Sequence, residues 1–335
     1  AVGHGVNDFD NVELFSSSTI SLNQNGTIIA IGTPRLFNNI GGIVVFRLIG
    51  GSWVQLGGLI THATNVSWTG WSVSLNNKGD ILAGGAPRYS TYRGRAAVWK
   101  YSNSDMSPGG TWSCIANYVN GLNLPGPSSQ NVLSLNNTYF GYQVRINDVG
   151  NRLFSTQPRF DGRIKTDGDY TYNAPKGNGW IYTFDYSNAD MSSGGSWSIT
   201  GYFTPGIASD PGENGRAGMD IGINSTGTLA VIGLPNINNG VGRIEVWRYS
   251  NPTGNPWERW TLLYGLNRPD PATIGVSGTV NRFGASVKMN GDGTIIAVGN
   301  NNTGYGSWKA SIIFYKWSNG TDFTSGTYNL MTSLG

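Results

Sequence analysis

A short pattern of residues recurs five times along the chain and restricts what it can fold into. Each copy is an apolar run, an Asn-x-x-Gly turn, a second apolar run and a Gly/Pro-rich break. The copies occupy residues 21–34, 74–87, 145–158, 222–235 and 288–301. A pattern repeated at this length is typical of an array of like supersecondary units, none of which can bury its apolar face alone. The 335 residues therefore predict one repeat domain rather than two unrelated domains.

The second copy shows the unit most clearly. Trp71, Val73 and Leu75 alternate with polar residues, which is the period-two pattern of a strand with one buried face. Residues 76–79 then supply a hairpin turn, in which Gly79 can adopt a positive φ. Further strands are expected at residues 81–83, 95–101 and 111–115. Four antiparallel strands, apolar at the inner end and aromatic at the outer end, predict one blade of a β-propeller.

The whole chain is predicted to be all-β, a five-bladed β-propeller of four-stranded antiparallel blades. No stretch of about ten residues keeps the 3.6-residue apolar period of a helix without Gly, Pro or β-branched interruptions. A single domain is expected over residues 1–335. Its blades are expected at residues 12–62, 63–120, 132–203, 214–266 and 278–335.

Charge and cysteine content limit the possible functions. Only 12% of the residues are charged, and the net charge of +3 comes from scattered Lys and Arg, which argues against nucleic-acid binding. The single cysteine, Cys114, excludes an internal disulfide and is expected to be a small buried hydrophobe. No apolar stretch is long enough to span a bilayer, so membrane insertion is not expected. The polar, weakly charged composition favours an extracellular or virion-surface location.

Short motifs at the ends of the strands belong to a known repeat. They are Phe140-Gly141 and Phe283-Gly284 before inner strands, and Gly85-Ala86-Pro87 after a second strand. With these motifs the unit resembles the FG-GAP repeat, the blade motif of integrin-α-type β-propellers, from about residue 12 onward. The resemblance implies a propeller like those of secreted bacterial proteins and of phage or large-virus structural proteins.

The calcium loop of that family is missing. Integrin repeats carry an Asp-x-Asp-x-Asp-Gly loop between the first two strands, whereas the loops of this chain hold at most one carboxylate. They begin at Asn23, Asn76, Asn147, Asn224 and Asn290. Because tight Ca²⁺ sites need several anionic oxygens, neither a metal site nor any other cofactor is predicted. The asparagines are predicted to be turn residues that bond the backbone.

Groups for catalysis are sparse. The chain has two His and shows no Ser-His-Asp pattern, metal-ligand spacing or phosphate loop. Its one acidic concentration consists of Asp161, Asp167, Asp169 and Asp185. Two carboxylates suffice for glycoside hydrolysis, but a solvated loop explains these residues more simply. The chain is therefore expected not to be an enzyme, with a secreted glycan-processing enzyme as the alternative.

Loop composition favours recognition instead. The candidate ligand-binding residues are Tyr89, Tyr92 and Arg93 in one long loop, and Asp167, Asp169, Tyr170 and Tyr172 in the next. Aromatic rings beside polar groups suit sugar or protein surfaces, although each ring could instead pack beneath its own loop. We expect a non-catalytic adhesion module of a virion or secreted appendage that binds a host-surface glycan or protein. A capsid- or tail-decorating protein that contacts neighbouring virion subunits is the alternative within this class.

Overall fold

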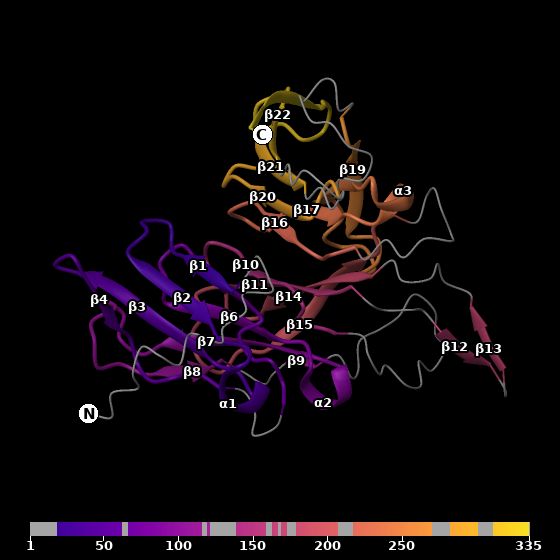
Figure 1. Ribbon diagram of the computed structural model, residues 1–335. Coiled ribbons are helices and arrows are strands. Elements are labelled where there is room, and N and C mark those ends of the chain that lie inside the picture. The colour runs from indigo at the N-terminus through magenta and orange to yellow at the C-terminus, as the bar shows by residue number, and fades with distance from the viewer. Residues whose placement is uncertain are drawn as a thin grey trace, which may run out of the picture.

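Five antiparallel sheets form the blades of a five-bladed β-propeller (Figure 1). The computed structural model describes residues 19–61, 66–115, 119–120, 139–158, 163–166, 169–172, 179–206, 217–269, 282–300 and 311–334. In each blade the strands follow one another in chain order, and every pair is antiparallel. The prediction of an all-β, five-bladed propeller is confirmed.

In every blade the innermost strand is shorter than the second and third strands. Blade 1 contains β1 (Ile20–Leu22), β2 (Ile28–Gly32), β3 (Ile43–Ile49) and β4 (Ser52–Gln55). Blade 2 contains β5 (Ser72–Leu75), β6 (Ile81–Ala86), β7 (Arg95–Tyr101) and β8 (Trp112–Cys114), with β9 (Val119–Asn120) also paired to β7. Blade 3 contains β10 (Val144–Ile146), β11 (Arg152–Gln157), β14 (Trp180–Tyr186) and β15 (Trp197–Phe203).

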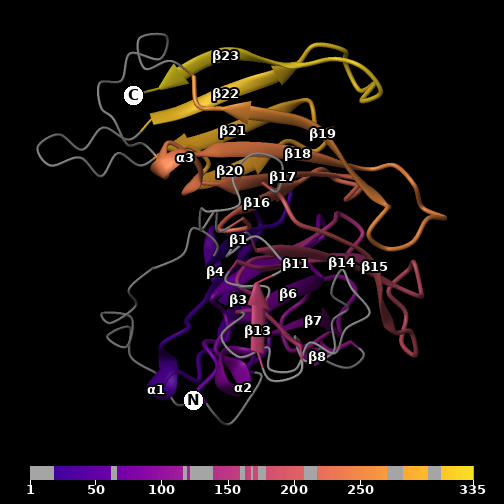
Figure 2. The same cartoon turned by 90° about the vertical axis from the view of Figure 1, so that its right-hand side faces the viewer.

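Blades 4 and 5 have the same order. Blade 4 contains β16 (Ile221–Ile223), β17 (Leu229–Leu234), β18 (Arg243–Tyr249) and β19 (Trp260–Asn267). Blade 5 contains β20 (Ser286–Met289), β21 (Ile295–Asn300), β22 (Ser311–Trp317) and β23 (Tyr328–Leu334). Figure 2 shows blades 4 and 5 stacked in the upper part of the molecule, with blades 1 to 3 in the lower part.

Small elements lie between the second and third strands of four blades. They are α1 (Leu36–Asn39), α2 (Tyr89–Tyr92), α3 (Ile237–Gly240) and a hairpin of β12 (Arg163–Thr166) and β13 (Asp169–Tyr172). Among the described residues, no helix is both long and apolar enough to cross a membrane.

The apolar core is divided among the spaces between consecutive blades. Between blades 2 and 3, for example, Ala83 and Val98 pack with Phe140, Leu153 and their neighbours. The blades approach so closely that a Cβ atom on Gly85 would lie 2.0 Å from the carbonyl oxygen of Gly141. Glycine at this position is therefore a packing requirement, which explains why Gly recurs at the end of the second strand.

The Asn-x-x-Gly turns lie side by side on one face of the array. Backbone hydrogen bonds of 2.8–3.2 Å link each turn to the next, from Gln24 to Asn77, Asp148, Ser225 and Gly291. Within the second turn, Oδ1 of Asn76 accepts hydrogen bonds from the amides of Gly79 (2.9 Å) and Ile81 (3.0 Å). The prediction that these asparagines are turn residues bonded to the backbone is confirmed.

Candidate functional site

The predicted aromatic loop of blade 2 is held by its own side chains. Tyr89 and Tyr92 lie in α2 and, like Arg93, are partly exposed. The Arg95 guanidinium lies 3.5 Å from the ring centroid of Tyr89, and that of Arg88 lies 4.5 Å from the ring of Tyr92. Arg88 also donates a hydrogen bond to the Tyr92 hydroxyl. Each of these contacts occupies one face of a tyrosine ring, so that face is not available for stacking on a ligand.

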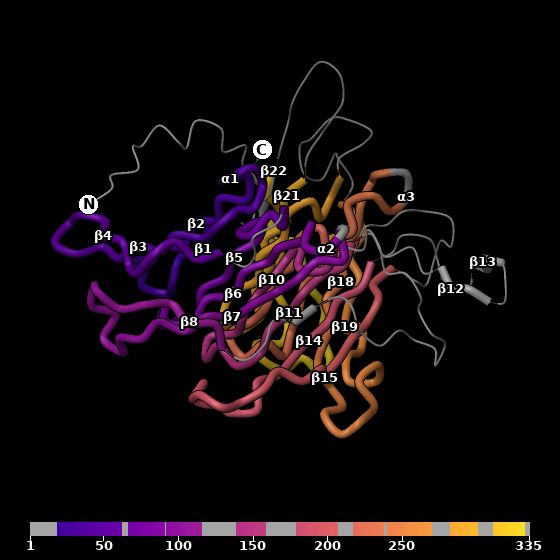
Figure 3. The backbone as a smooth tube through the Cα atoms, turned by 90° about the horizontal axis from the view of Figure 1, so that it is seen from below, coloured from indigo at the N-terminus to yellow at the C-terminus, as the bar shows by residue number. Residues whose placement is uncertain are grey.

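The second half of the predicted patch lies elsewhere. Asp169, Tyr170 and Tyr172 belong to β13, while Asp167 lies outside the described residues. Figure 1 shows the β12–β13 hairpin beyond the blades and apart from α2, and Figure 3 shows α2 close to the strands of the blades, so the structure does not bring the two halves together. Ligand binding by these residues stays a prediction.

The acidic concentration also does not form a site in the described residues. Asp161 and Asp167 lie outside them. Asp185 is committed to an ion pair, because its Oδ1 accepts a hydrogen bond from Nε of Arg152 at 2.6 Å. The described residues contain no group of three or more His, Cys, Asp or Glu side chains that could hold a metal ion.

Cys114 differs from the expectation. It lies in β8, at the outer edge of blade 2, and is exposed rather than buried. In a short edge strand, the alternation of apolar and polar residues does not specify which face packs against the blade. The expected burial of Cys114 was therefore wrong. The surrounding protein still raises the pKa of its thiol to about 11, so the thiol stays protonated at neutral pH.

One open cavity of about 560 Å³ lies on the turn face, between blades 1 and 2. Its lining charges have partners already: Nζ of Lys78 lies 3.0 Å from Oδ2 of Asp80, and Nη1 of Arg47 donates to the carbonyl oxygen of Asp105 at 2.8 Å. Asp105 itself accepts a hydrogen bond from the Ser107 amide, as expected of a turn cap. This cavity is a structural junction rather than a reactive site.

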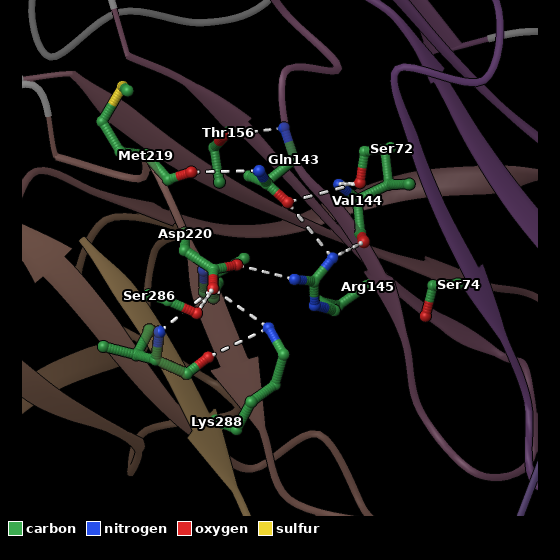
Figure 4. A network of polar contacts seen from close by, with 12 residues as sticks. Ser72, Ser74, Gln143, Val144, Arg145, Thr156, Met219, Asp220, Ser286 and Lys288 are labelled. Carbon is green, nitrogen blue, oxygen red and sulfur yellow. Dashed lines mark hydrogen bonds and ion pairs between the residues drawn. The ribbon is translucent and has the colours of Figure 1, made fainter. Parts of the chain in front are cut away.

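A charged network lies instead at the inner ends of blades 3, 4 and 5 (Figure 4). In β10, Val144 and Ile146 are buried in the core shared with blade 2, so the intervening Arg145 points to the opposite side, toward blade 4. There Nη2 of Arg145 donates to Oδ1 of Asp220 at 2.7 Å. From blade 5, Nζ of Lys288 donates to Oδ2 of the same carboxylate at 3.0 Å. Three blades thus meet at one carboxylate.

Asp220 is the buried centre of this network, with no exposed side-chain surface. Its oxygens also accept hydrogen bonds from the amides of Ile221 (2.9 Å) and Val287 (3.0 Å) and from the Ser286 hydroxyl (3.0 Å). Burial alone would raise the pKa of the carboxyl group, but the charges of Arg145 and Lys288 outweigh it and the pKa is lowered. Asp220 is therefore ionised at neutral pH.

Polar side chains of blades 2 and 3 complete the surroundings of Arg145. Its Nη1 donates to Oε1 of Gln143 at 3.2 Å, and Nε2 of Gln143 donates to the carbonyl oxygen of Met219 at 3.0 Å. The Ser72 hydroxyl accepts the Val144 amide hydrogen at 3.0 Å. The Ser72 bond pairs a backbone amide at the free edge of β10, which would otherwise be left without a partner.

Lys288 is the accessible member of the network, with 54% of its side chain exposed. Its Nζ donates to Asp220 and, at 3.1 Å, to the Val287 carbonyl oxygen. An ammonium group has three donors, so one is available to a ligand. Partial burial and the neighbouring charge of Arg145 lower the pKa of its amine to about 8. The lowered pKa makes the neutral amine, which can act as a base, more accessible near neutral pH than it is for an ordinary lysine.

This site is not visible in the sequence, because its members look unremarkable in the chain. Arg145, Asp220 and Lys288 are single polar residues in or beside alternating strands, the usual pattern of solvent-facing positions. The signal that could have revealed them is their place in the repeat. Arg145 and Lys288 occupy the same repeat position, where blades 1 and 2 carry Ser21 and Ser74 and blade 4 carries Gly222.

Comparison with known proteins supports the fold. No protein-family model and no curated protein sequence matches the chain, so membership of the FG-GAP family is not shown. Among solved structures, it is similar to the periplasmic gluconolactonase of Pseudomonas aeruginosa (TM-score 0.54, 14% identity, 95% of this chain and 71% of that chain). Others are a 6-phosphogluconolactonase candidate from Bacteroides uniformis (TM-score 0.45, 10% identity, 94% and 84%) and TolB from Acinetobacter baumannii (TM-score 0.41, 10% identity, 93% and 53%).

The similarity to the gluconolactonase corrects the functional expectation. The interpretation as a non-catalytic adhesion module is contradicted, because the likeness to the gluconolactonase extends over nearly the whole chain and is a likeness to an enzyme. At 14% identity the likeness shows the fold alone, so the reaction does not transfer with it. The expected partners, a host-surface glycan or protein or neighbouring virion subunits, stay untested.

Proposed function

We propose that the chain is a hydrolase that opens the ester bond of a sugar-derived lactone at the inner ends of blades 3, 4 and 5. The observation that carries the proposal is the exposed Lys288 amine, whose pKa is lowered to about 8 beside Arg145 and the buried Asp220. Perturbed titratable groups held by specific charged partners are typical of functional sites. The name of the similar Pseudomonas aeruginosa protein supports a lactone as the first substrate class to test.

In the proposed reaction the neutral Lys288 amine acts as the general base. It removes a proton from a water molecule as the water oxygen attacks the lactone carbonyl carbon. When the ring C–O bond breaks, the leaving oxygen takes a proton from the Lys288 ammonium group, so that one water is added overall. The product is the open-chain hydroxy acid.

Arg145 and Asp220 have supporting roles in this proposal. The Arg145 guanidinium places positive potential beside the site, which favours the negative charge that develops on the carbonyl oxygen. Asp220 binds both cations and holds them in place across three blades. A glycoside hydrolase would need a pair of carboxylates, and the described network contains Asp220 alone. A lactone therefore fits this site better than a glycosidic bond.

The cellular location of this activity is also part of the proposal. We propose that the chain works outside the cytoplasm, like the periplasmic protein that it resembles. The narrower expectation of a virion surface finds no support in the likeness to this periplasmic protein.

A substrate panel tests the proposal. Acid release from glucono-1,5-lactone is followed by pH-stat at pH 8, with a protein-free blank for spontaneous opening and a p-nitrophenyl glycoside as the comparison substrate. We expect the chain to accelerate lactone opening and to leave the glycoside intact. Glycoside cleavage without lactone opening, or no acceleration of either substrate, would contradict the proposal.

A further inference from the structure

Arg88 packs against two aromatic rings and has no acidic partner. Its guanidinium carbon lies 4.3 Å from the ring centroid of Trp68 and 4.5 Å from that of Tyr92. One donor of the group is used, because Nη2 donates a hydrogen bond to the Tyr92 hydroxyl. A guanidinium has five N–H donors, and among the described residues no carboxylate and no second acceptor bonds this one. The aromatic contacts thus hold a cation whose charge is not compensated.

The ring of Trp68 is itself supported by a second indole. The ring centroids of Trp68 and Trp71 are 4.7 Å apart with 12° between their planes, and Trp71 is 8% exposed. Nε1 of each indole and Nε of Arg88 are buried and have no hydrogen-bond acceptor. Unpaired buried donors cost free energy, and oriented N–H groups favour an anion nearby. What this cluster lacks is an acceptor.

The chain segments that form the cluster contain no acidic residue. Residues 81–101 include three arginines and one lysine but neither Asp nor Glu. Residues 66–79, which supply both indoles, also contain no acidic residue. An anion that approaches Arg88 is therefore attracted by the surrounding charge and meets no carboxylate from these segments.

The backbone fixes the position of the two aromatic contacts. The amide of Trp68 donates to the carbonyl oxygen of Asn39, and the amide of Arg88 donates to that of Ser67, both at 3.1 Å. Trp68 and Tyr92 have positive φ angles of 57° and 63°, which residues other than glycine rarely adopt. Such strain persists only where the surroundings impose it, and it is common in ligand-binding segments. Because the guanidinium is already ordered, a ligand loses little of its binding energy to ordering it.

We propose that Arg88 is the centre of a binding site for an oxyanion, the carboxylate or phosphate group of a small molecule. A planar guanidinium binds such a group through two parallel N–H···O hydrogen bonds. Trp68 and Tyr92 keep the guanidinium in place for this contact. A neutral ligand would leave the charge of Arg88 uncompensated.

This site is separate from the one proposed for lactone opening. Arg88 follows β6, at the end of the strand opposite to the Asn76 turn, and it has no contact with Arg145, Asp220 or Lys288 in the described network. The inference therefore goes beyond the proposed hydrolase and does not depend on it.

Protection from an arginine reagent tests the inference on the wild-type chain. Phenylglyoxal modification of Arg88 is followed by peptide mass spectrometry in sodium acetate, sodium phosphate or sodium chloride at equal ionic strength. Arg282, an exposed arginine before β20, is the internal reference. At about 50 mM anion we expect modification of Arg88 to slow about sixfold, as for a site with a Kd of about 10 mM. The more protective of acetate and phosphate identifies the group that the site prefers.

A conservative variant separates the planar fork from the charge alone. Arg88→Lys keeps the positive charge but cannot form two parallel bonds, so we expect it to bind the more protective anion at least about tenfold more weakly in isothermal titration. Arg282→Lys is the matched control and should bind as wild type does. Equal slowing in chloride, equal protection of Arg282, no protection of Arg88, or wild-type affinity in Arg88→Lys would overturn the inference. None of these readouts involves lactone opening.

Discussion

Lys288 is the residue on which the proposed chemistry depends. Its amine has a pKa lowered to about 8 by partial burial and by Arg145, so the protonated form is lost as pH rises through that value. We expect kcat/KM for lactone opening to rise with pH and to level off above about 8. A pH–rate profile corrected for the spontaneous reaction measures this. A profile that falls across the same range would exclude a Lys288 base.

Asp220 is the residue whose loss should matter most for stability. Asp220→Asn leaves Arg145 and Lys288 without their shared anion in a buried setting, so we expect about 3–5 kcal/mol of destabilisation in urea unfolding at pH 7. Asp80→Asn removes the partner of the half-exposed Lys78 and is the control, with an expected loss below about 1 kcal/mol.

The difference in unfolding free energy between wild type and Asp220→Asn should change with pH in one direction. The pKa of Asp220 is lowered in the folded protein, so its contribution is present above the pKa of the unfolded chain and is lost as pH falls through the lowered value. The gap between wild type and Asp220→Asn should therefore shrink in acid. A gap that widens would contradict the assignment of Asp220 as an ionised anion.

At the scale of single elements, the Asn turn stabilises each blade and links it to the next. Asn76 accepts two backbone amide hydrogens and donates to Oδ1 of Asp80 at 2.9 Å. Asn76→Ala leaves buried donors unpaired, so we expect a loss of about 2–3 kcal/mol in thermal or urea unfolding. Asn25→Ala, at an exposed position in the first turn, should change stability by less than about 0.5 kcal/mol. Equal losses would show that the hydrogen bonds of Asn76 contribute no more to stability than an exposed turn position does.

The elements were predictable because their signals are local. Alternation such as Trp71, Val73 and Leu75 and the turn at Asn76 specify strands and hairpins within a few residues. The site was not predictable in this way, since Arg145, Asp220 and Lys288 come from three blades and meet only through the propeller geometry. Composition favours the patch around Tyr92 but does not reveal that Arg88 lies over one face of its ring.

For the whole molecule, the repeat predicts five blades but not what the array does. The same architecture carries many functions. The absence of known catalytic motifs does not exclude an enzyme in a chain that matches no family model.

Calcium independence is a prediction for the whole array. The Asn turns hold at most one carboxylate each, so removal of divalent ions should remove no ligand from the folded state. We expect Tm measured in excess EDTA to stay within about 2 °C of its value in added calcium, because loss of a bound ligand would shift it by mass action. A larger decrease in EDTA would show that the family's metal role is retained in another form.

The most direct test of the account compares lactone opening by wild type, Lys288→Met, Lys288→Arg and Lys316→Met, with folding checked by circular dichroism. Lys316, an exposed lysine of β22 in the same blade, is the matched control. We predict that both Lys288 variants lose at least about 100-fold in kcat/KM, as for removal of a general base, while Lys316→Met keeps the wild-type value. Wild-type rates in a folded Lys288→Met or Lys288→Arg variant would contradict the assignment of the inner network as the active site.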